Sequence, residues 1–569
     1  SALAAAIACT TLLTDPTASA RPAGGGVVPV LNCNDSGPGS LRDVIAHALS
    51  GDHVEIPADI GCDAIALASG PIVIANDAAA GQPFMQLNID GPGRDAFAID
   101  GGGLDRVFVQ DAGFYAALQL YGLKVRSGAS DTSGGCIYAA GAVVLDDVEV
   151  SDCVAGIVSG DTTLGNPAVR GGGIYAVQTA YLFNSTLTRN HVYGGAADAY
   201  GGGAFSPGTI GAINSTISEN TIDSVGGAAY GGGLAAGDHH PGQSVALTLI
   251  ASSVSSNTSH SSCSFCGSRG GGAWAYASAQ LLDGDFSGNV ASSSYGYGTG
   301  GGLYFDTGYY AASSTTSVIG THFHCNSADT GGGIAAIGTL AVSRAIFDCN
   351  TATSDGGAIA LLGDSVTLTD SSLLANVAIG RGGGIFQFGY GDTAITNSTI
   401  SGNVAGNGGA FGNTYGSLHI ANSTIADNVA FEHGGGVFFR YAYYEFEARS
   451  SIIAGNTGNQ VAEDLWPPGM TVSGSHDLIM AADGVEVPAD TLSADPMLAA
   501  PAPNGGPTLT QALGEGSPAI DAGSNDGGLA FDQRGEGFAR VFGAAADIGA
   551  FEVQPSLPSD VIFANGFEL

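Results

Sequence analysis

One pattern recurs along the middle of this chain: a short apolar segment, an asparagine, a polar loop and a glycine triplet. It stands as NSTISGNVAGNGGAF at Asn397–Phe411 and as NSTIADNVAFEHGGGVF at Asn422–Phe438, and in looser form back to Val150. Self-similarity at such a period indicates a solenoid, in which each repeat packs only on its neighbours. The chain is therefore expected to form one stack of coils.

The repeats align on the corner residue that ends each long segment. These corner residues are Cys153, Asn190, Asn220, Asn257, Asn289, Asn326, Asn350, Asn376, Asn403, Asn428 and Asn456. The residue three positions earlier is always apolar, from Val150 to Ile453, and so is the residue eight positions earlier, from Leu145 to Ala448. Short β-rich segments with apolar slots at fixed offsets predict an all-β, right-handed parallel β-helix. Asparagine tolerates the left-handed backbone of a corner and can bond to the asparagine of the next coil.

The flanking segments predict caps and a leader. Ser40 can cap a helix whose Leu41, Val44, Ile45, Ala48 and Leu49 form one apolar face, suited to closing the first coil. The first residues are apolar as far as Leu13 and end in Ala18-Ser19-Ala20, the pattern of a secretory signal peptide. We divide the chain into a signal-peptide remnant (1–20), an N-terminal cap (21–63), a β-helix (64–481), an irregular C-terminal cap (482–555) and a tail of sorting-signal character (556–569).

Charge and hydropathy narrow the range of partners. The chain has 15 basic and 52 acidic residues, a net charge of −37, and a single lysine, Lys124. Such a surface repels nucleic acid and anionic membranes, and no later apolar run reaches the length of a transmembrane segment. We expect a monomer outside the cell, whose partner is an extracellular glycan or a surface protein. We expect no cofactor, and at most weak calcium binding by the acidic surface.

Apart from Cys9 in the leader, the chain has eight cysteines, an even number suited to an oxidising compartment. Cys325 and Cys349 each precede the corner asparagine of neighbouring coils, so stacking brings them within disulfide reach. Cys136 and Cys153 bound one nearly closed coil. We predict the pairs Cys325–Cys349, Cys136–Cys153 and Cys33–Cys62, and Cys263 with Cys266 can form a small ring.

The terminal motifs resemble a known class of bacterial proteins. NDSGPGSLRDVI (Asn34–Ile45) is similar to the N-terminal element of secreted β-helix proteins with a CSLREA-type motif. GSPAIDAG (Gly516–Gly523), DQRG (Asp532–Gly535) and DIGAFE (Asp547–Glu552) resemble the choice-of-anchor Q domain. The central repeats are similar to those of polymorphic outer-membrane proteins and related adhesins. The resemblance implies a secreted or surface-displayed bacterial β-helix, most members of which lack an assigned activity.

Two acidic pairs are candidates for catalysis. Asp147 with Glu149, and Asp283 with Asp285, occupy corresponding positions, and side chains two apart on a strand share a face. Asn184, Asn214, Asn397 and Asn422 hold the first position of the pair in other coils, which favours a turn position instead. The Gly-His-Gly element of polygalacturonases is absent from the sequence. His239 and His240 lack further ligands at metal-binding spacing, so no metal site is expected.

An aromatic residue recurs at the second position after the glycine triplet, where period two points it outward. This predicted aromatic stripe consists of Tyr175, Phe205, Trp274, Tyr304, Phe386, Phe411 and Phe438. Exposed aromatic stripes usually mark recognition surfaces, so we predict a ligand-binding face here. The alternative is that the loops fold over the stripe and make it a satellite core.

These observations favour a non-catalytic adhesin or glycan-binding scaffold, without excluding an enzyme. The alternative is a polysaccharide lyase or glycoside hydrolase on the same fold, since fold alone does not decide activity. A third possibility is a structural spacer. An enzyme should show clustered carboxylates in a cleft, or a carboxylate–Arg–Lys group across adjacent coils, whereas a binding protein needs only an exposed stripe.

Overall fold

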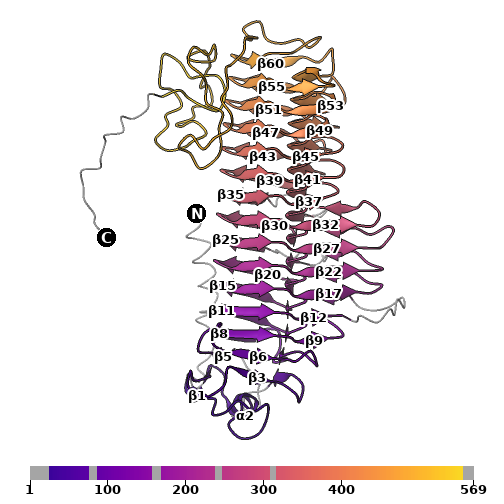
Figure 1. The fold of residues 1–569 in the computed structure, drawn as a ribbon, viewed down its shortest axis with the longest axis vertical. Coiled ribbons are helices and arrows are strands. Elements are labelled where there is room, and N and C mark those ends of the chain that lie inside the picture. Colours follow the sequence, from indigo (N-terminus) through magenta and orange to yellow (C-terminus); the bar gives the residue numbers. More distant parts are fainter. Residues whose placement is uncertain (1–24, 76–85, 157–167, 238–245, 308–314, 555–569) are drawn as a thin grey trace, which may run out of the picture.

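The chain forms the predicted right-handed parallel β-helix (Figure 1). The structure, a computed structural model, describes residues 25–75, 86–156, 168–237, 246–307 and 315–554. Its strands form four sheets, which we call sheet A (29 strands), sheet B (14 strands), sheet C (13 strands) and sheet D (5 strands). The strand pairs are parallel, apart from the antiparallel pair of β57 (Thr457–Gly458) with β58 (Val461–Ala462) at the end of sheet C. Sheets A, B and C run along the stack, and sheet D accompanies only its first half.

A representative coil shows how the repeat builds the fold. After the glycine triplet, β14 (Ile174–Ala176) enters sheet B, and β15 (Thr179–Phe183) and β16 (Thr186–Thr188) enter sheet A. Beyond the corner Asn190, β17 (His191–Gly194) joins sheet C and β18 (Ala199–Tyr200) joins sheet D. Each strand pairs in parallel with its equivalent one coil away, as β16 does with β21 (Thr216–Ser218).

The core is filled by the residues that the alignment places inside. Every residue in the two apolar slots, from Val150 to Ile453 and from Leu145 to Ala448, is buried. Three of them form a stack of rings: Phe286, Phe323 and Phe347 follow one another at centroid distances of 4.8 Å. The predicted register is therefore confirmed.

The corner asparagines form a continuous ladder inside the turn. Asn190 Nδ2 donates to Asn220 Oδ1 at 2.9 Å, and the same bond repeats up the stack to Asn456. The ladder ends where Asn456 Nδ2 donates to the carboxylate of Asp464 at 2.8 Å. These side chains are buried, so their amide groups need hydrogen-bond partners within the protein. The ladder provides these partners, because each amide between its ends donates to the asparagine of one neighbouring coil and accepts from that of the other.

A second ladder of hydroxyl groups runs along the first corner of sheet A. There the backbone N–H of one coil donates to the serine Oγ of the next, as from Ser371 to Ser398 and from Ser398 to Ser423. Ser451 donates at 2.9 Å to the buried Asp477, which ends the row. Both ladders thus end on a carboxylate.

The ends of the stack differ from each other. Helix α2 (Leu41–His47) begins at Ser40, whose side chain accepts from Asp43 N, and its buried residues close the first coil (Figure 1). Leu49, placed on the same apolar face by the sequence, is exposed. Sheet A starts with β1 (Val27–Pro29) and β2 (His53–Glu55), earlier than the predicted boundary at residue 64. Within the described ranges, no helix has the length and apolar character needed to span a membrane.

The C-terminal region lies along the side of the last coils, outside sheet A (Figure 1). Gln533 Nε2 donates to Ser371 O, and Asn422 Nδ2 donates to Ser524 O. Its DQRG and DIGAFE motifs meet in a buried ionic network, in which Arg534 pairs with Asp532 and donates to Glu552 O. These motifs therefore hold the region together. The predicted signal-peptide remnant (1–20) and the predicted tail (556–569) lie outside the described residues.

Four disulfides join neighbouring segments as predicted: Cys33–Cys62, Cys136–Cys153, Cys263–Cys266 and Cys325–Cys349. The last joins two stacked corners in left-handed backbone conformation, with a Cα–Cα distance of 4.5 Å. Disulfides of this number are compatible with an oxidising, extracellular compartment.

Candidate functional site

Most of the predicted aromatic stripe is not a surface. Phe205, Trp274, Tyr304 and Phe386 are buried, and Tyr175 is half-buried beside them. Sheet D, the part of each long loop that forms a strand, supplies the residues that cover Phe205, Trp274 and Tyr304. Phe386 lies beyond the end of sheet D, and there Arg381 lies over its ring at 4.5 Å. Tyr200 and Tyr230 stack on each other at 4.6 Å, and the Tyr230 ring meets the Trp274 ring at 5.2 Å. The predicted exposure of these residues is wrong, because the loops build a second core.

The last two residues of the stripe have other environments. Phe411 is fully buried in the main core, where it pairs with Ile385 on one side and Val437 on the other. Its coil has Ala410 as the third member of the glycine triplet, so Phe411 occupies the inward position. Phe438 faces outward but is half-buried, paired with Trp466 of the next coil. Neither residue belongs to an exposed stripe.

A different group of rings, three of them exposed and three half-buried, lies on the loops that leave sheet B in the second half of the stack. We call it the loop aromatic cluster: Phe388, Tyr390, Tyr415, Tyr441, Tyr443 and Tyr444. The rings lie after β46 (Ile385–Gln387), β50 (Phe411–Asn413) and β54 (Val437–Phe439), one group per coil. Tyr390 is 76% exposed and Tyr443 is 74% exposed. Sheet D has ended before these coils, so no strand of it covers them.

The rings of the loop aromatic cluster contact one another across the coils. Tyr390 stacks on Tyr415 at 4.7 Å, and Tyr415 stacks on Tyr441 at 6.3 Å. Tyr443 and Tyr444 approach at 4.7 Å. Partial burial and the neighbouring Tyr443 raise the pKa of Tyr444 to about 12. The tyrosines thus present apolar ring faces together with hydroxyl groups.

A hollow of about 590 Å³ adjoins this cluster. Its lining consists of Leu362, Gly363, Asp364, Phe388, Gly389, Tyr390, Gly391 and Tyr415. The aromatic rings make its walls largely apolar, and Asp364 is the one acidic side chain in its lining. A surface of this kind suits a ligand that has both flat apolar faces and hydroxyl groups.

The first residue of each acidic pair lies at a corner, whereas Glu149 and Asp285 lie in strands of sheet A. Asp147 and Asp283 have positive φ angles, 54° and 51°, as do Asn184, Asn214, Asn397 and Asn422 at the equivalent positions. A residue in left-handed conformation interrupts the alternation of a strand, which is why asparagine and aspartate recur here. The geometry supports a turn role for Asp147 and Asp283.

A set of ion pairs crosses the first coils on the outer face of sheet A. Lys124 Nζ lies 3.2 Å from Glu149 Oε2, and Arg94 Nε lies 3.3 Å from Asp147 Oδ1. One coil is joined to the next by the pair of Arg126 with Asp100, at 2.9 Å. This is a carboxylate–Arg–Lys group across adjacent coils.

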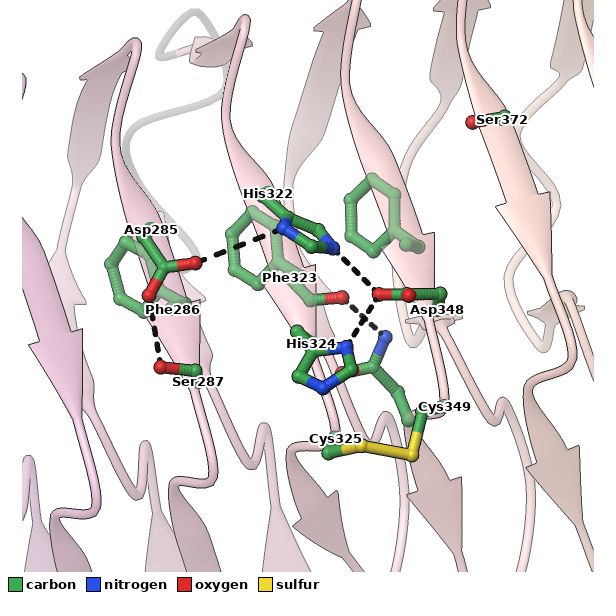
Figure 2. Close-up of polar contacts among 12 residues, drawn as sticks. Asp285, Phe286, Ser287, His322, Phe323, His324, Cys325, Asp348, Cys349 and Ser372 are labelled. Atoms are coloured by element: carbon green, nitrogen blue, oxygen red, sulfur yellow. Dashed lines mark hydrogen bonds and ion pairs between the residues drawn. A yellow bond between two sulfur atoms is a disulfide. The ribbon is translucent and has the colours of Figure 1, made fainter. Parts of the chain in front are cut away.

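A cluster of two histidines and an aspartate lies farther along the same face (Figure 2). His322 Nε2 is 2.6 Å from Asp348 Oδ1, and His324 Nδ1 is 2.9 Å from the same oxygen. Asp285 Oδ1 lies 3.8 Å from His322 Nδ1 on the other side. The hydrogen bond to Asp348 raises the pKa of His322 against the opposing effect of its partial burial. The pKa of Asp348 is lowered, because its bonds to both histidines outweigh its desolvation.

The sequence contains signals for the cluster of two histidines and an aspartate and for the loop aromatic cluster. His324 and Asp348 stand two residues before successive corner asparagines, and Asp285 and His322 stand four residues before theirs, so the repeat alignment already makes them neighbours. The aromatic residues of the loops follow the glycine triplets at no fixed spacing. Their only signal in the sequence is that such residues recur after successive triplets. His239 and His240 lie outside the described residues.

Comparisons with known proteins add little to this picture. No protein-family model and no curated protein matches the sequence. Among solved structures, the crystal structure of pectate lyase Pel9A aligns with a TM-score of 0.23 and 13% identity, over 93% of this chain and 98% of that chain. The fold assignment rests on the strand pairing within this chain.

Proposed function

We propose that this protein is a secreted or surface-displayed β-helix that binds a neutral extracellular polysaccharide through the loop aromatic cluster. The observation that carries the proposal is the exposure of Tyr390 and Tyr443 beside the hollow. Large exposed aromatic patches are uncommon on soluble proteins and usually mark recognition sites. The similarity of the termini to those of secreted β-helix proteins, together with the disulfides, supports a place outside the cell.

Three features favour a polysaccharide over other partners. The rings recur coil by coil, so a repetitive chain can meet several of them at once. Tyrosine offers a flat face for a sugar ring and a hydroxyl group for its substituents. With a net charge of −37, the protein repels polyanions such as uronate polymers, which makes a neutral chain the better partner.

The proposal is tested by affinity gel electrophoresis with entrapped polysaccharides. Neutral polymers, such as soluble β-glucan, xylan and galactomannan, are compared with polygalacturonate and alginate. At least one neutral polymer should retard the protein, and the variant Tyr390→Ala/Tyr443→Ala should bind it roughly thirtyfold more weakly, if each ring contributes about 1 kcal/mol.

A matched control is available in Tyr295 and Tyr297, which are also exposed, on a loop in the first half of the stack. Their replacement by alanine should leave the retardation unchanged. Absence of retardation by every neutral polymer, or equal losses in both double variants, would refute the proposal.

A second candidate is a polysaccharide lyase, favoured by the ion pairs of Lys124, Arg94 and their carboxylates on sheet A. Lysine can act as a base when its pKa suits proton abstraction, and an arginine can neutralise a uronate. Polygalacturonate and alginate should then yield unsaturated products, and Lys124→Ala should abolish them. Release of no product from either polymer by the wild-type protein would leave polysaccharide binding as the function.

A further inference from the structure

The histidine–aspartate cluster owes its geometry to the alternation of one strand. In β36 (His322–His324) the central Phe323 points into the core, within the stack of rings, so both histidines point outward on the same face (Figure 2). The next strand, β40 (Ile346–Asp348), pairs with β36 so that Asp348 lies beside His324. The previous strand, β31 (Asp285–Ser287), brings Asp285 beside His322.

We propose that His322, His324 and Asp348 bind a zinc ion on the outer face of sheet A. One ligand atom from each of the three residues lies within 4.8 Å of the others. Zinc with bonds of about 2.0–2.2 Å holds neighbouring ligand atoms roughly 3.3–3.5 Å apart. The two histidine–aspartate separations, 2.6 and 2.9 Å, must therefore open by less than about 1 Å. The histidine side chains are 40% and 46% exposed, which leaves their tips room to adjust.

Two cross-links directly after the ligands hold the backbone that carries them. The Cys325–Cys349 disulfide joins the residues that directly follow His324 and Asp348. One residue farther, Asn326 Nδ2 donates to Asn350 Oδ1 at 3.0 Å in the buried ladder. The two strands therefore cannot slide past each other, and the entropy cost of assembling the site is largely met in the folded protein.

The type of ligands selects the metal. Two imidazoles and one carboxylate suit zinc and its neighbours among the transition metals, whereas calcium and magnesium require oxygen ligands. If His322 binds zinc through Nε2, its Nδ1 faces Asp285, which can accept the remaining proton as carboxylates commonly do behind zinc-bound histidines. A fourth position stays open to solvent or to a group of a partner molecule.

The test is a zinc titration of the intact, oxidised protein in competition with a chromophoric chelator. We expect one zinc ion per chain with micromolar or stronger affinity, unaffected by millimolar calcium. His322→Ala, His324→Ala and Asp348→Asn should each weaken binding at least tenfold. Cobalt substitution supplies a second measurement, since its absorption bands should change in each variant.

His419→Ala is the matched control. His419 lies on the same face of sheet A and faces Glu447 of the next coil at 3.4 Å, but the described chain places no second histidine beside it. This variant, and a His239→Ala/His240→Ala variant, should bind zinc like the wild type. Absence of stoichiometric binding, or loss of binding in a control but not in His322→Ala, would overturn the proposal.

Discussion

At the scale of single residues, the loop above an aromatic side chain decides whether it belongs to a core or to a surface. Trp274 and Tyr390 both follow glycine triplets, yet the first is 0% exposed and the second is 76% exposed. Sheet D covers Trp274, and it ends before the coil of Tyr390. The alternation of side chains along a strand predicts that Trp274 points out of the main core. Its burial could not be predicted in the same way, because sheet D, which covers it, is built by loops without a fixed repeat.

Trp274→Ala should therefore destabilise the protein without affecting polysaccharide binding. Removing a buried indole leaves a cavity beneath Tyr200 and Tyr230, and such losses cost about 3–5 kcal/mol. Urea unfolding followed by circular dichroism measures the change in the free energy of unfolding. A loss of less than about 1 kcal/mol in the free energy of unfolding would contradict the burial of this ring.

The carboxylates that end the two ladders should make stability depend on pH. Burial raises the pKa of Asp477 to about 7 and that of Asp464 to about 6, from 3.8 in both cases. The unfolded chain gives up these protons near pH 4, whereas the folded protein keeps them up to about pH 6 at Asp464 and about pH 7 at Asp477. The free energy of unfolding should therefore fall as pH rises through this window, by up to about 1.4 kcal/mol per pH unit for each group.

Thermal unfolding at pH 5 and at pH 7.5 measures this effect. Asp477→Ser, which restores the residue type of the ladder, should reduce the difference in Tm between the two values. The exposed Asp147→Asn serves as a control that leaves the difference unchanged. A difference that is equally large in Asp477→Ser and in the wild type would rule out Asp477 as the titrating group.

At the scale of elements, the asparagine ladder explains why the coils keep their register despite loops of different length. Asn350→Ala should reveal its contribution, because Asn350 Oδ1 accepts from both the side chain and the backbone of Asn326. These buried donors would lose their partner, at a cost of about 3 kcal/mol or more in the free energy of unfolding.

Asn407→Ala is the control. The side chain of Asn407 donates to the exposed Glu432, so its loss should cost well under 1 kcal/mol. Chemical denaturation of both variants compares the two costs, and equal values would contradict the ladder's importance.

The elements of the core could be predicted because their sequence repeats. The slots of Val150 and Leu145, the corner asparagines and the Cys325–Cys349 pair all follow from one alignment. The functional surfaces could be predicted only in part. The loop aromatic cluster lies in loops of irregular length, and the histidine–aspartate cluster requires comparing three coils at the same offsets.

At the scale of the whole molecule, different parts of the chain cover different regions of the outer surface of the β-helix. Sheet D covers sheet B in the first half, and the C-terminal region covers sheet A beside the last coils (Figure 1). This arrangement leaves the loop aromatic cluster open in the second half. It also leaves open the part of sheet A that carries Lys124 and His322.

Tyrosine nitration mapped by mass spectrometry, with and without the neutral polysaccharide that binds, tests the central claim most directly. The account predicts that Tyr390 and Tyr443 react in the free protein and are protected by the polysaccharide, while Tyr295 reacts equally in both samples and Tyr304 in neither. Reaction of Tyr304 in the free protein, or unchanged reaction of Tyr390 and Tyr443 under saturating polysaccharide, would contradict it.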